Sequence, residues 1–126
     1  MNIRQERPAD YDTVYRIIKE AFADAEHSDG SEQDLVSALR KSEAFIPELS
    51  LVALEDNRIV GHILFTEAVV NDVKVLALAP LSVLPEYRNR GIGQAMFRRA
   101  DMESGRLFWW KRKTLWQYAS AKMKTA

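Results

Sequence analysis

Apolar residues near the start of the chain recur at helical spacing. After Pro8, five of them are separated by three and four residues: Val14, Ile17, Ile18, Ala21 and Phe22. This pattern is typical of one buried helix face, and Pro8 suits a first helical turn. Residues 31–41 predict a second helix, with Ser31 at its N-terminal cap.

Four strands are predicted, at residues 2–7, 48–55, 58–70 and 75–84. The pairs Asp56-Asn57 and Asn71-Asp72 favour tight turns, so the last three strands should form antiparallel hairpins. Residues 75–79 are apolar throughout, which is typical of a strand covered on both faces, so we expect this strand in the middle of the sheet. This order of elements predicts an α+β fold.

Pro80 interrupts the last of these strands. A proline cannot donate to a ladder of backbone hydrogen bonds and is expected at a bulge or an edge, yet the strand pattern resumes at Leu81. We therefore predict a bulged, splayed strand. Its backbone groups at Leu81, Ser82 and Val83 should be free to bond something other than a neighbouring strand.

The strand leads into a turn rich in arginine and glycine, and then into a helix. In order the residues are Arg88, Asn89, Arg90, Gly91, Ile92, Gly93 and Gln94. Glycines let a backbone approach a ligand closely, and the unpaired amides of a helix start favour an anion. Arg88 and Arg90 add charge suited to phosphate oxygens. The segment predicts a pyrophosphate cradle, and the alternative is an ordinary strand, turn and helix with surface arginines.

Composition narrows the class of protein. At 126 residues the chain supports one domain with one core. Its 18 basic and 18 acidic residues give zero net charge, so neither a nucleic acid nor a membrane is the expected partner. The chain has no cysteine, which excludes disulfides and thiolate catalysis, and its two isolated histidines predict no metal site.

Two motifs carry a family resemblance. Arg88 to Gly93 matches the signature Arg/Gln-x-x-Gly-x-Gly/Ala, and Ala79 to Tyr87 matches a segment of the type Gly-Pro-Leu-x-Val-Leu-Pro-Glu-Tyr. With these motifs the chain resembles the GNAT family of acyl-CoA-dependent N-acetyltransferases, most closely its bacterial branch. The resemblance covers residues 1–100 and implies one domain over residues 1–126. It implies a three-layer α/β/α fold with a mixed, mainly antiparallel central sheet.

The resemblance also implies a chemistry. Acetyl-CoA would be the cosubstrate, its pantetheine bonded to Leu81–Val83 and its pyrophosphate resting on Arg88–Gln94, and the protein would act in the cytoplasm. Its acetyl group would pass to a primary amine by direct attack. Glu67 is then the expected base, acting through water, and Tyr118 the expected acid for the leaving thiolate.

His62 is interpreted differently from Glu67. The two residues are five positions apart on one predicted strand, so their side chains should lie on opposite faces of the sheet. We interpret His62 as a packed or strand-surface histidine and not as a base.

Residues 24–34 form an acidic segment with two interpretations. It carries Asp24, Glu26, Asp29, Glu32 and Asp34. Such a segment is compatible with solvated surface alone. In the resembling family the helix pair around it lines the acceptor side, so a cationic amine, on a small molecule or a peptide, is the second hypothesis.

The resemblance weakens over residues 101–126. Gly105 is expected to end the helix, residues 106–110 to form a strand parallel to the bulged one, and residues 114–122 to form a short helix. The family's final strands are not found. A truncated product and a compact variant completed by a second subunit are the two explanations, and both predict self-association as a homodimer.

Two other functions stay open from the residues alone. The divergent end favours an acyl-CoA-binding domain with little or no catalytic activity, which would bind CoA without amine-dependent release. The tryptophans and basic residues of the same end favour a nucleic-acid-binding module, whose binding would depend strongly on salt.

Overall fold

Four antiparallel strands form one sheet in the order β1-β2-β3-β4. The computed structural model describes residues 1–25 and 28–107. In chain order its elements are β1 (Asn2–Gln5), a 3₁₀ turn η1 (Pro8–Asp10), α1 (Tyr11–Ala21), α2 (Glu32–Arg40), β2 (Phe45–Glu55), β3 (Arg58–Val70), β4 (Val73–Val83), a 3₁₀ turn η2 (Pro85–Tyr87) and α3 (Ile92–Leu107).

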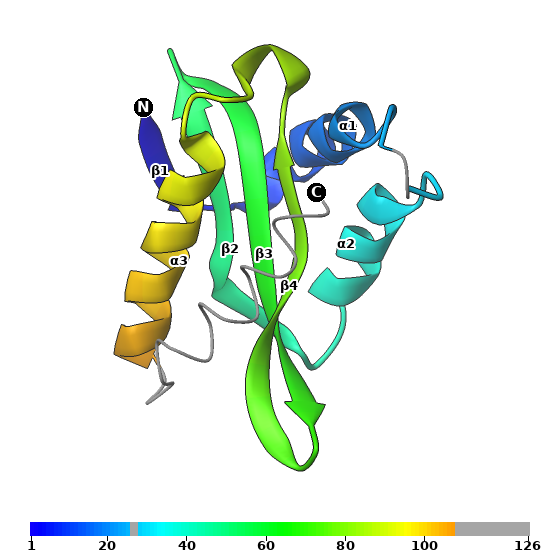
Figure 1. The fold of residues 1–126 in the computed structure, drawn as a ribbon, viewed down its shortest axis with the longest axis vertical. Coiled ribbons are helices and arrows are strands. Elements are labelled where there is room, and N and C mark those ends of the chain that lie inside the picture. The colour runs from blue at the N-terminus through cyan, green and yellow to red at the C-terminus, as the bar shows by residue number, and fades with distance from the viewer. Residues whose placement is uncertain (26–27, 108–126) are drawn as a thin grey trace.

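The helices lie on both faces of the sheet. Helix α3 packs on one face against β2, β3 and β4, whereas α1 and α2 pack on the other face (Figure 1). The predicted α+β class and three-layer α/β/α arrangement are therefore confirmed. Within the described residues every strand pair is antiparallel.

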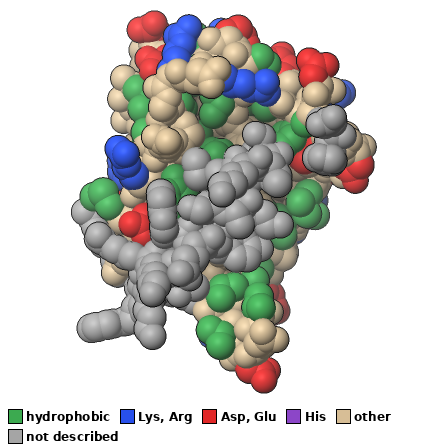
Figure 2. All heavy atoms as spheres, viewed as in Figure 1, with side chains coloured by type: hydrophobic (Ala, Val, Ile, Leu, Met, Phe, Trp, Pro, Cys, Tyr) green, Lys and Arg blue, Asp and Glu red, His purple; other side chains and the backbone are tan. Residues whose placement is uncertain are grey.

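Both predicted hairpin turns are present. Asp56 and Asn57 have φ values of 50° and 64°, and Asn71 and Asp72 have 51° and 63°, as expected of the tight turns that join twisted strands. The β3–β4 hairpin projects from the body, and hydrophobic side chains gather on it (Figure 2). Its valines at positions 69, 70 and 73 are exposed.

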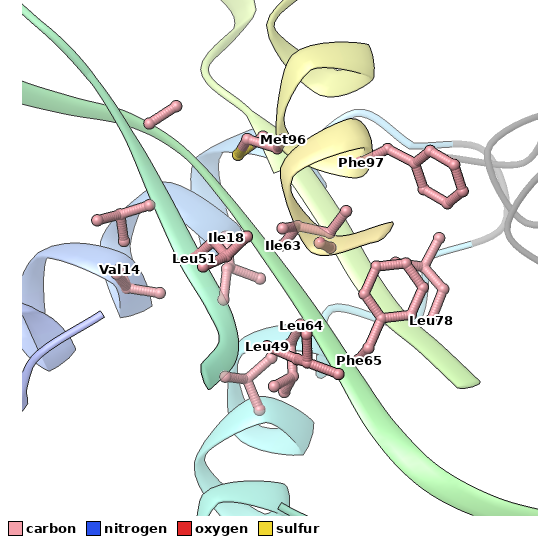
Figure 3. Close-up of a cluster of buried hydrophobic side chains, with 14 of the residues drawn as sticks. Val14, Ile18, Leu49, Leu51, Ile63, Leu64, Phe65, Leu78, Met96 and Phe97 are labelled. Atoms are coloured by element: carbon pink, nitrogen blue, oxygen red, sulfur yellow. The ribbon is translucent and has the colours of Figure 1, made fainter. Parts of the chain in front are cut away.

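The core fills the space between the sheet and its helices. Val14 and Ile18 of α1 are fully buried, and so are Ile63 and Leu64 of β3 (Figure 3). On the α3 side, the rings of Phe65 and Phe97 pack with their centroids 5.9 Å apart at an angle of 57°.

Gly61 of β3 sets how closely α3 approaches the sheet. A Cβ atom at this position would lie 3.0 Å from Met96 Cε and 3.1 Å from the Ser82 carbonyl oxygen. Both distances are tight for a carbon atom. The missing side chain therefore makes room for Met96.

Two expectations about the second half of the chain are wrong. Helix α3 continues through Gly105 to Leu107, so the helix does not end at Gly105, and Arg106 does not begin a strand. Gly105 has no positive φ, and a single helical glycine costs only about 1 kcal/mol. The rest of the predicted strand and the predicted short helix lie outside the described residues.

Within the described residues, the place of the bulged strand in the sheet differs from the predicted central one. Among the described residues β4 is an edge strand, paired only with β3. Its apolar run is covered by α1, α2 and α3 and not by a strand on each side. An all-apolar run reports burial of the two faces and says nothing about the two edges.

Candidate cofactor site

The predicted bulge lies at Pro80. Leu64 pairs with Ala79 and Ile63 pairs with Leu81, so Pro80 has no partner on β3. Because proline has no N–H to donate, it loses nothing at the skipped position. The bulge predicted from the sequence is confirmed.

Beyond the bulge, β4 turns two amides outward. The N–H of Leu84 donates to the carbonyl of Val60 on β3 at 2.9 Å. Backbone groups alternate in direction along an antiparallel strand, so the N–H and C=O of Ser82 also face β3, whereas those of Leu81 and Val83 face away. Of the three predicted residues, Leu81 and Val83 therefore carry the backbone groups that face away from β3.

The α3 start adds further amides beside this edge. Gly91 accepts the first helical hydrogen bond, from the N–H of Ala95 at 3.0 Å, so the amides of residues 92–94 precede the helical ladder. Gly91 has a φ of 79° and is exposed, a conformation that suits glycine. A Cβ on Gly93 would lie 3.3 Å from Leu81 Cδ2, so this turn packs directly beside the bulge.

Ile92 contributes its backbone alone. Its side chain is buried in the core with only 3% exposed, whereas Asn89 and Gln94 are exposed. Asn89 has a φ of 63°, which a residue with a short polar side chain tolerates well. The chain thereby reverses direction just before α3.

The two predicted phosphate arginines take different positions. Arg88 donates from Nη2 to the carbonyl oxygen of Ala21 at 2.5 Å, at the C-terminal end of α1, where the helix dipole favours a cation. Arg90 lies over the Tyr87 ring with its guanidinium carbon 5.0 Å from the centroid. Arg90 is therefore the arginine whose charge is not already directed at a backbone carbonyl.

The structure does not bring Glu67 to the bulge. Glu67 pairs across the sheet with Leu76 and forms an ion pair with Lys74 at 3.3 Å. Glu67 is five positions along the strand from His62, a distance of about 16 Å. Tyr118, the predicted acid, lies outside the described residues.

His62 is packed, as interpreted from the sequence. It is fully buried, and burial lowers its pKa to about 4, while Glu6 raises that pKa and Arg40 lowers it further. The imidazole is therefore neutral at pH 7.

Acidic residues of the predicted acceptor segment make local hydrogen bonds. Asp29 accepts from the Ser31 backbone N–H at 3.0 Å and from its hydroxyl, which lowers the pKa of the Asp29 carboxyl. Ser31 occupies the predicted cap position of α2, but its side chain turns to Asp29 instead of the helix. Asp34 accepts from the Tyr15 hydroxyl at 3.0 Å.

A shallow cleft lies on the α1 side of η2. Its volume is about 210 Å³, and it is lined by Thr13, Arg16, Ile17, Glu20, Arg58, Ile59 and Leu84. Its charged residues are of both signs. The cleft therefore does not by itself favour a cationic or an anionic ligand.

Sequence reasoning missed one buried polar group. Glu6, at the end of β1, contacts Arg40 of α2 and Ser50 of β2. Glu6 and Arg40 are 34 positions apart, and no local spacing relates them. The one signal was the polar pair at positions 50 and 62, each inside an apolar stretch of its strand.

A bulged strand edge leads into an arginine-flanked helix start inside an α/β/α sandwich, and the free amides of a helix start suit an anion. The model of the acetyltransferase (GNAT) family matches residues 11–112. The chain belongs to the GNAT family, as its two motifs predicted.

Three known proteins illustrate the relationship. The chain is 42% identical over 71 residues to the uncharacterized N-acetyltransferase YjhQ of Escherichia coli, covering 53% of this chain and 39% of that protein. The match thus spans about two fifths of that relative's length. A GNAT family acetyltransferase from Brucella melitensis, solved with acetyl-CoA, superimposes with a TM-score of 0.76 at 33% identity, over 84% of this chain and 70% of that one.

The third similarity concerns the fold alone. An aminoglycoside 6'-N-acetyltransferase from Acinetobacter haemolyticus superimposes with a TM-score of 0.62 at 20% identity, over 84% of this chain and 72% of that one. Within the described ranges, no helix has the length and apolarity needed to cross a membrane. The same ranges contain no group of three metal-ligating side chains.

Proposed function

We propose that residues 1–126 form one N-acetyltransferase domain, which transfers the acetyl group of acetyl-CoA to a primary amine by direct attack. One observation carries the proposal: the outward amides of Leu81 and Val83 adjoin the first-turn amides of α3, through the contact of Gly93 with Leu81. The pantetheine of acetyl-CoA would extend along the strand edge, and the pyrophosphate of acetyl-CoA would lie at residues 88–94. The Brucella melitensis relative, solved with acetyl-CoA, supports this choice of cosubstrate.

The reaction requires a neutral amine. An alkyl amine has a pKa near that of lysine, about 10.4, so its proton must leave before the nitrogen attacks the thioester. The Val83 amide, on the free edge, would stabilise the oxyanion. Tyr118 would protonate the departing thiolate, and Glu67 would accept the amine proton only through a chain of water molecules.

The proposal extends to the surroundings of the enzyme. The acceptor is an amine of a small molecule or a peptide, and the acidic residues beside α2 support a cationic one. We place the protein in the cytoplasm, where acetyl-CoA is available. Exposed valines of the β3–β4 hairpin support a homodimer.

Calorimetric titration with acetyl-CoA tests the cradle. The native chain should bind, and Arg90→Glu and Gly91→Asp should each lower the affinity at least about tenfold, because both place negative charge beside the pyrophosphate. Arg98→Glu is the matched control, since Arg98 is exposed on α3 beyond the cradle and should bind nearly as the native chain does. A folded native chain that does not bind acetyl-CoA would refute the proposal.

Amine-dependent release of CoA tests the transfer step. A thiol reagent would follow release across a panel of amines and peptides. Release with any of them supports the enzyme. Binding of acetyl-CoA without release from any amine would favour the acyl-CoA-binding domain instead.

A further inference from the structure

A buried row of polar side chains crosses the sheet beneath α1 and α2. Arg40 binds Glu6 through two hydrogen bonds of 3.1 and 2.5 Å. The Ser50 hydroxyl lies 2.8 Å from Glu6 Oε1 and 3.0 Å from His62 Nε2. The side chains of Glu6 and His62 are almost completely buried. The row therefore runs from α2, past the end of β1 and through β2, to the middle of β3.

The directions of these hydrogen bonds are fixed by their chemistry. Glu6 accepts hydrogen bonds from Arg40 and from the Ser50 hydroxyl. The Ser50 hydroxyl has one hydrogen, which it donates in its hydrogen bond to Glu6. Ser50 must then accept from His62, so His62 carries its hydrogen on Nε2. Its Nδ1 is consequently unprotonated, and its lone pair needs a hydrogen-bond donor.

A donor without a partner lies on the next strand. His62 Nδ1 and Ser82 Oγ are both buried and have no hydrogen-bond partner among the described residues. The two residues are direct cross-strand partners, and directly opposed residues hold their Cβ atoms about 4.5–5.5 Å apart. One rotation of the Ser82 side chain, or one water molecule, spans the gap between the donor and the acceptor.

We propose that Ser82 donates to His62 Nδ1 and completes a one-way hydrogen-bond chain, Ser82 to His62 to Ser50 to Glu6, which ties the bulge of β4 to α2. The chain makes Ser82 and His62 positioning residues for acetyl transfer, a role that rests on the proposed function. Ser82 is the residue between the two outward amides. A shift of about 1 Å in such groups can slow a reaction about a hundredfold.

The neighbouring charges are compatible with this chain. Burial keeps His62 neutral by lowering its pKa to about 4. Tyr11 of α1 stacks on the Arg40 guanidinium, whose carbon lies 4.0 Å from the ring centroid. Asp10 of η1 is already paired with Arg4 of β1 at 2.7 Å. Glu6 and Arg40 therefore remain the charges that act on His62.

Nitrogen NMR of the histidines tests the hydrogen-bond chain without an activity measurement. The chain has two histidines, so His27→Asn assigns the His62 signals. Between pH 6 and pH 8 we expect the His62 ring to be neutral and protonated at Nε2. We also expect the Nδ1 chemical shift to indicate a hydrogen bond, and Ser82→Ala to remove that indication. Protonation at Nδ1, or an Nδ1 signal that Ser82→Ala leaves unchanged, would overturn the chain.

Kinetics test the positioning role. Ser82→Ala should lower kcat about 10- to 100-fold while the Kd for acetyl-CoA changes less than about threefold. Ser50→Ala should act similarly, and the double variant should be no slower than the slower single variant, because both changes break one chain. Ser104→Ala is the control: Ser104 is buried on α3 and bonds the Asp101 carbonyl at 2.8 Å.

The outcomes separate the two proposals. If Ser82→Ala keeps the native kcat, or if the Ser50 and Ser82 effects multiply independently, the positioning role is overturned. If Ser104→Ala lowers kcat as much as Ser82→Ala does, the effect is one of packing and the role is again overturned. If the native protein transfers no acetyl group, the positioning role is refuted together with the proposed function. The NMR result still decides whether the hydrogen-bond chain exists.

Discussion

The two faces of the sheet are buried by different chemistry. Helix α3 covers its face mainly with apolar side chains, and Ser104 is buried beside them; the apolar ones are Ile92, Met96, Phe97 and Ala100. The face beneath α1 and α2 also has an apolar core, but it encloses Glu6, Ser50, His62 and Ser82. Apolar burial stabilises with little regard to direction, whereas buried polar groups are tolerated only where their hydrogen bonds are satisfied.

This difference separates stability from positioning. The α3 face can accept a substitution of similar size and remain functional. The polar face restricts its residues to types that maintain the hydrogen-bond directions. We therefore expect substitutions on the α3 face to change the free energy of unfolding chiefly, and those on the polar face to change it together with activity.

The largest expected effect is on the α3 face. Phe97→Ala should lower the free energy of unfolding by about 4 kcal/mol, because it removes a ring that is 2% exposed and packs on Phe65. Urea denaturation measures the loss. Arg98→Ala, at the exposed neighbouring position, should change stability by less than about 0.5 kcal/mol. Equal losses in the two variants would contradict the apolar character of this interface.

A smaller loss is expected from the polar face. Glu6→Gln should cost about 3 kcal/mol, because the Arg40 guanidinium stays buried without a countercharge. The same denaturation experiment applies. Adding Arg40→Met to Glu6→Gln should restore much of the loss, since no unpaired charge then remains. If the double variant is less stable than Glu6→Gln, the loss does not come from the unpaired charge of Arg40.

The smallest effect is a pH dependence that the α3 face does not share. The pKa of His62 is lowered from 6.5 to about 4 in the folded chain, so the unfolded chain binds more protons between these values. Stability should be complete above about pH 6.5 and fall with acidification, by about 2 kcal/mol at pH 5. Thermal unfolding from pH 8 to pH 5 measures this, with His27→Asn as the comparison. If a folded His62→Asn variant loses stability with falling pH as steeply as the native protein does, the pH dependence belongs to other groups.

Much of the fold follows from local patterns. The third strand was predicted at its observed bounds, residues 58–70, because turn pairs mark both of its ends. The Pro80 bulge was predictable because proline lacks the donor that a ladder needs. The end of α3 was not, because a glycine at a helix stop and a glycine within a helix look alike in sequence.

The candidate site was predictable only in its local part. Gly91 and Gly93 are close in sequence to the strand that they adjoin, so their motif was visible. The hydrogen-bonded row from Arg40 to His62 joins residues from three elements and the segment after β1, and no spacing in the sequence encodes such contacts. The contact of Arg88 with the end of α1 spans 67 positions and was missed for the same reason.

Gly61 has a consequence for how the sequence can diverge. The space that it leaves is filled by Met96, and an added methyl group would meet both this side chain and the Ser82 carbonyl. Positions 61 and 96 should therefore vary together in related chains, with alanine at 61 accompanied by a shorter residue at 96. The glycine therefore links the permitted size of a residue on α3 to the backbone of β4 beside the bulge, so sequence change on the apolar face is limited by the geometry of that strand.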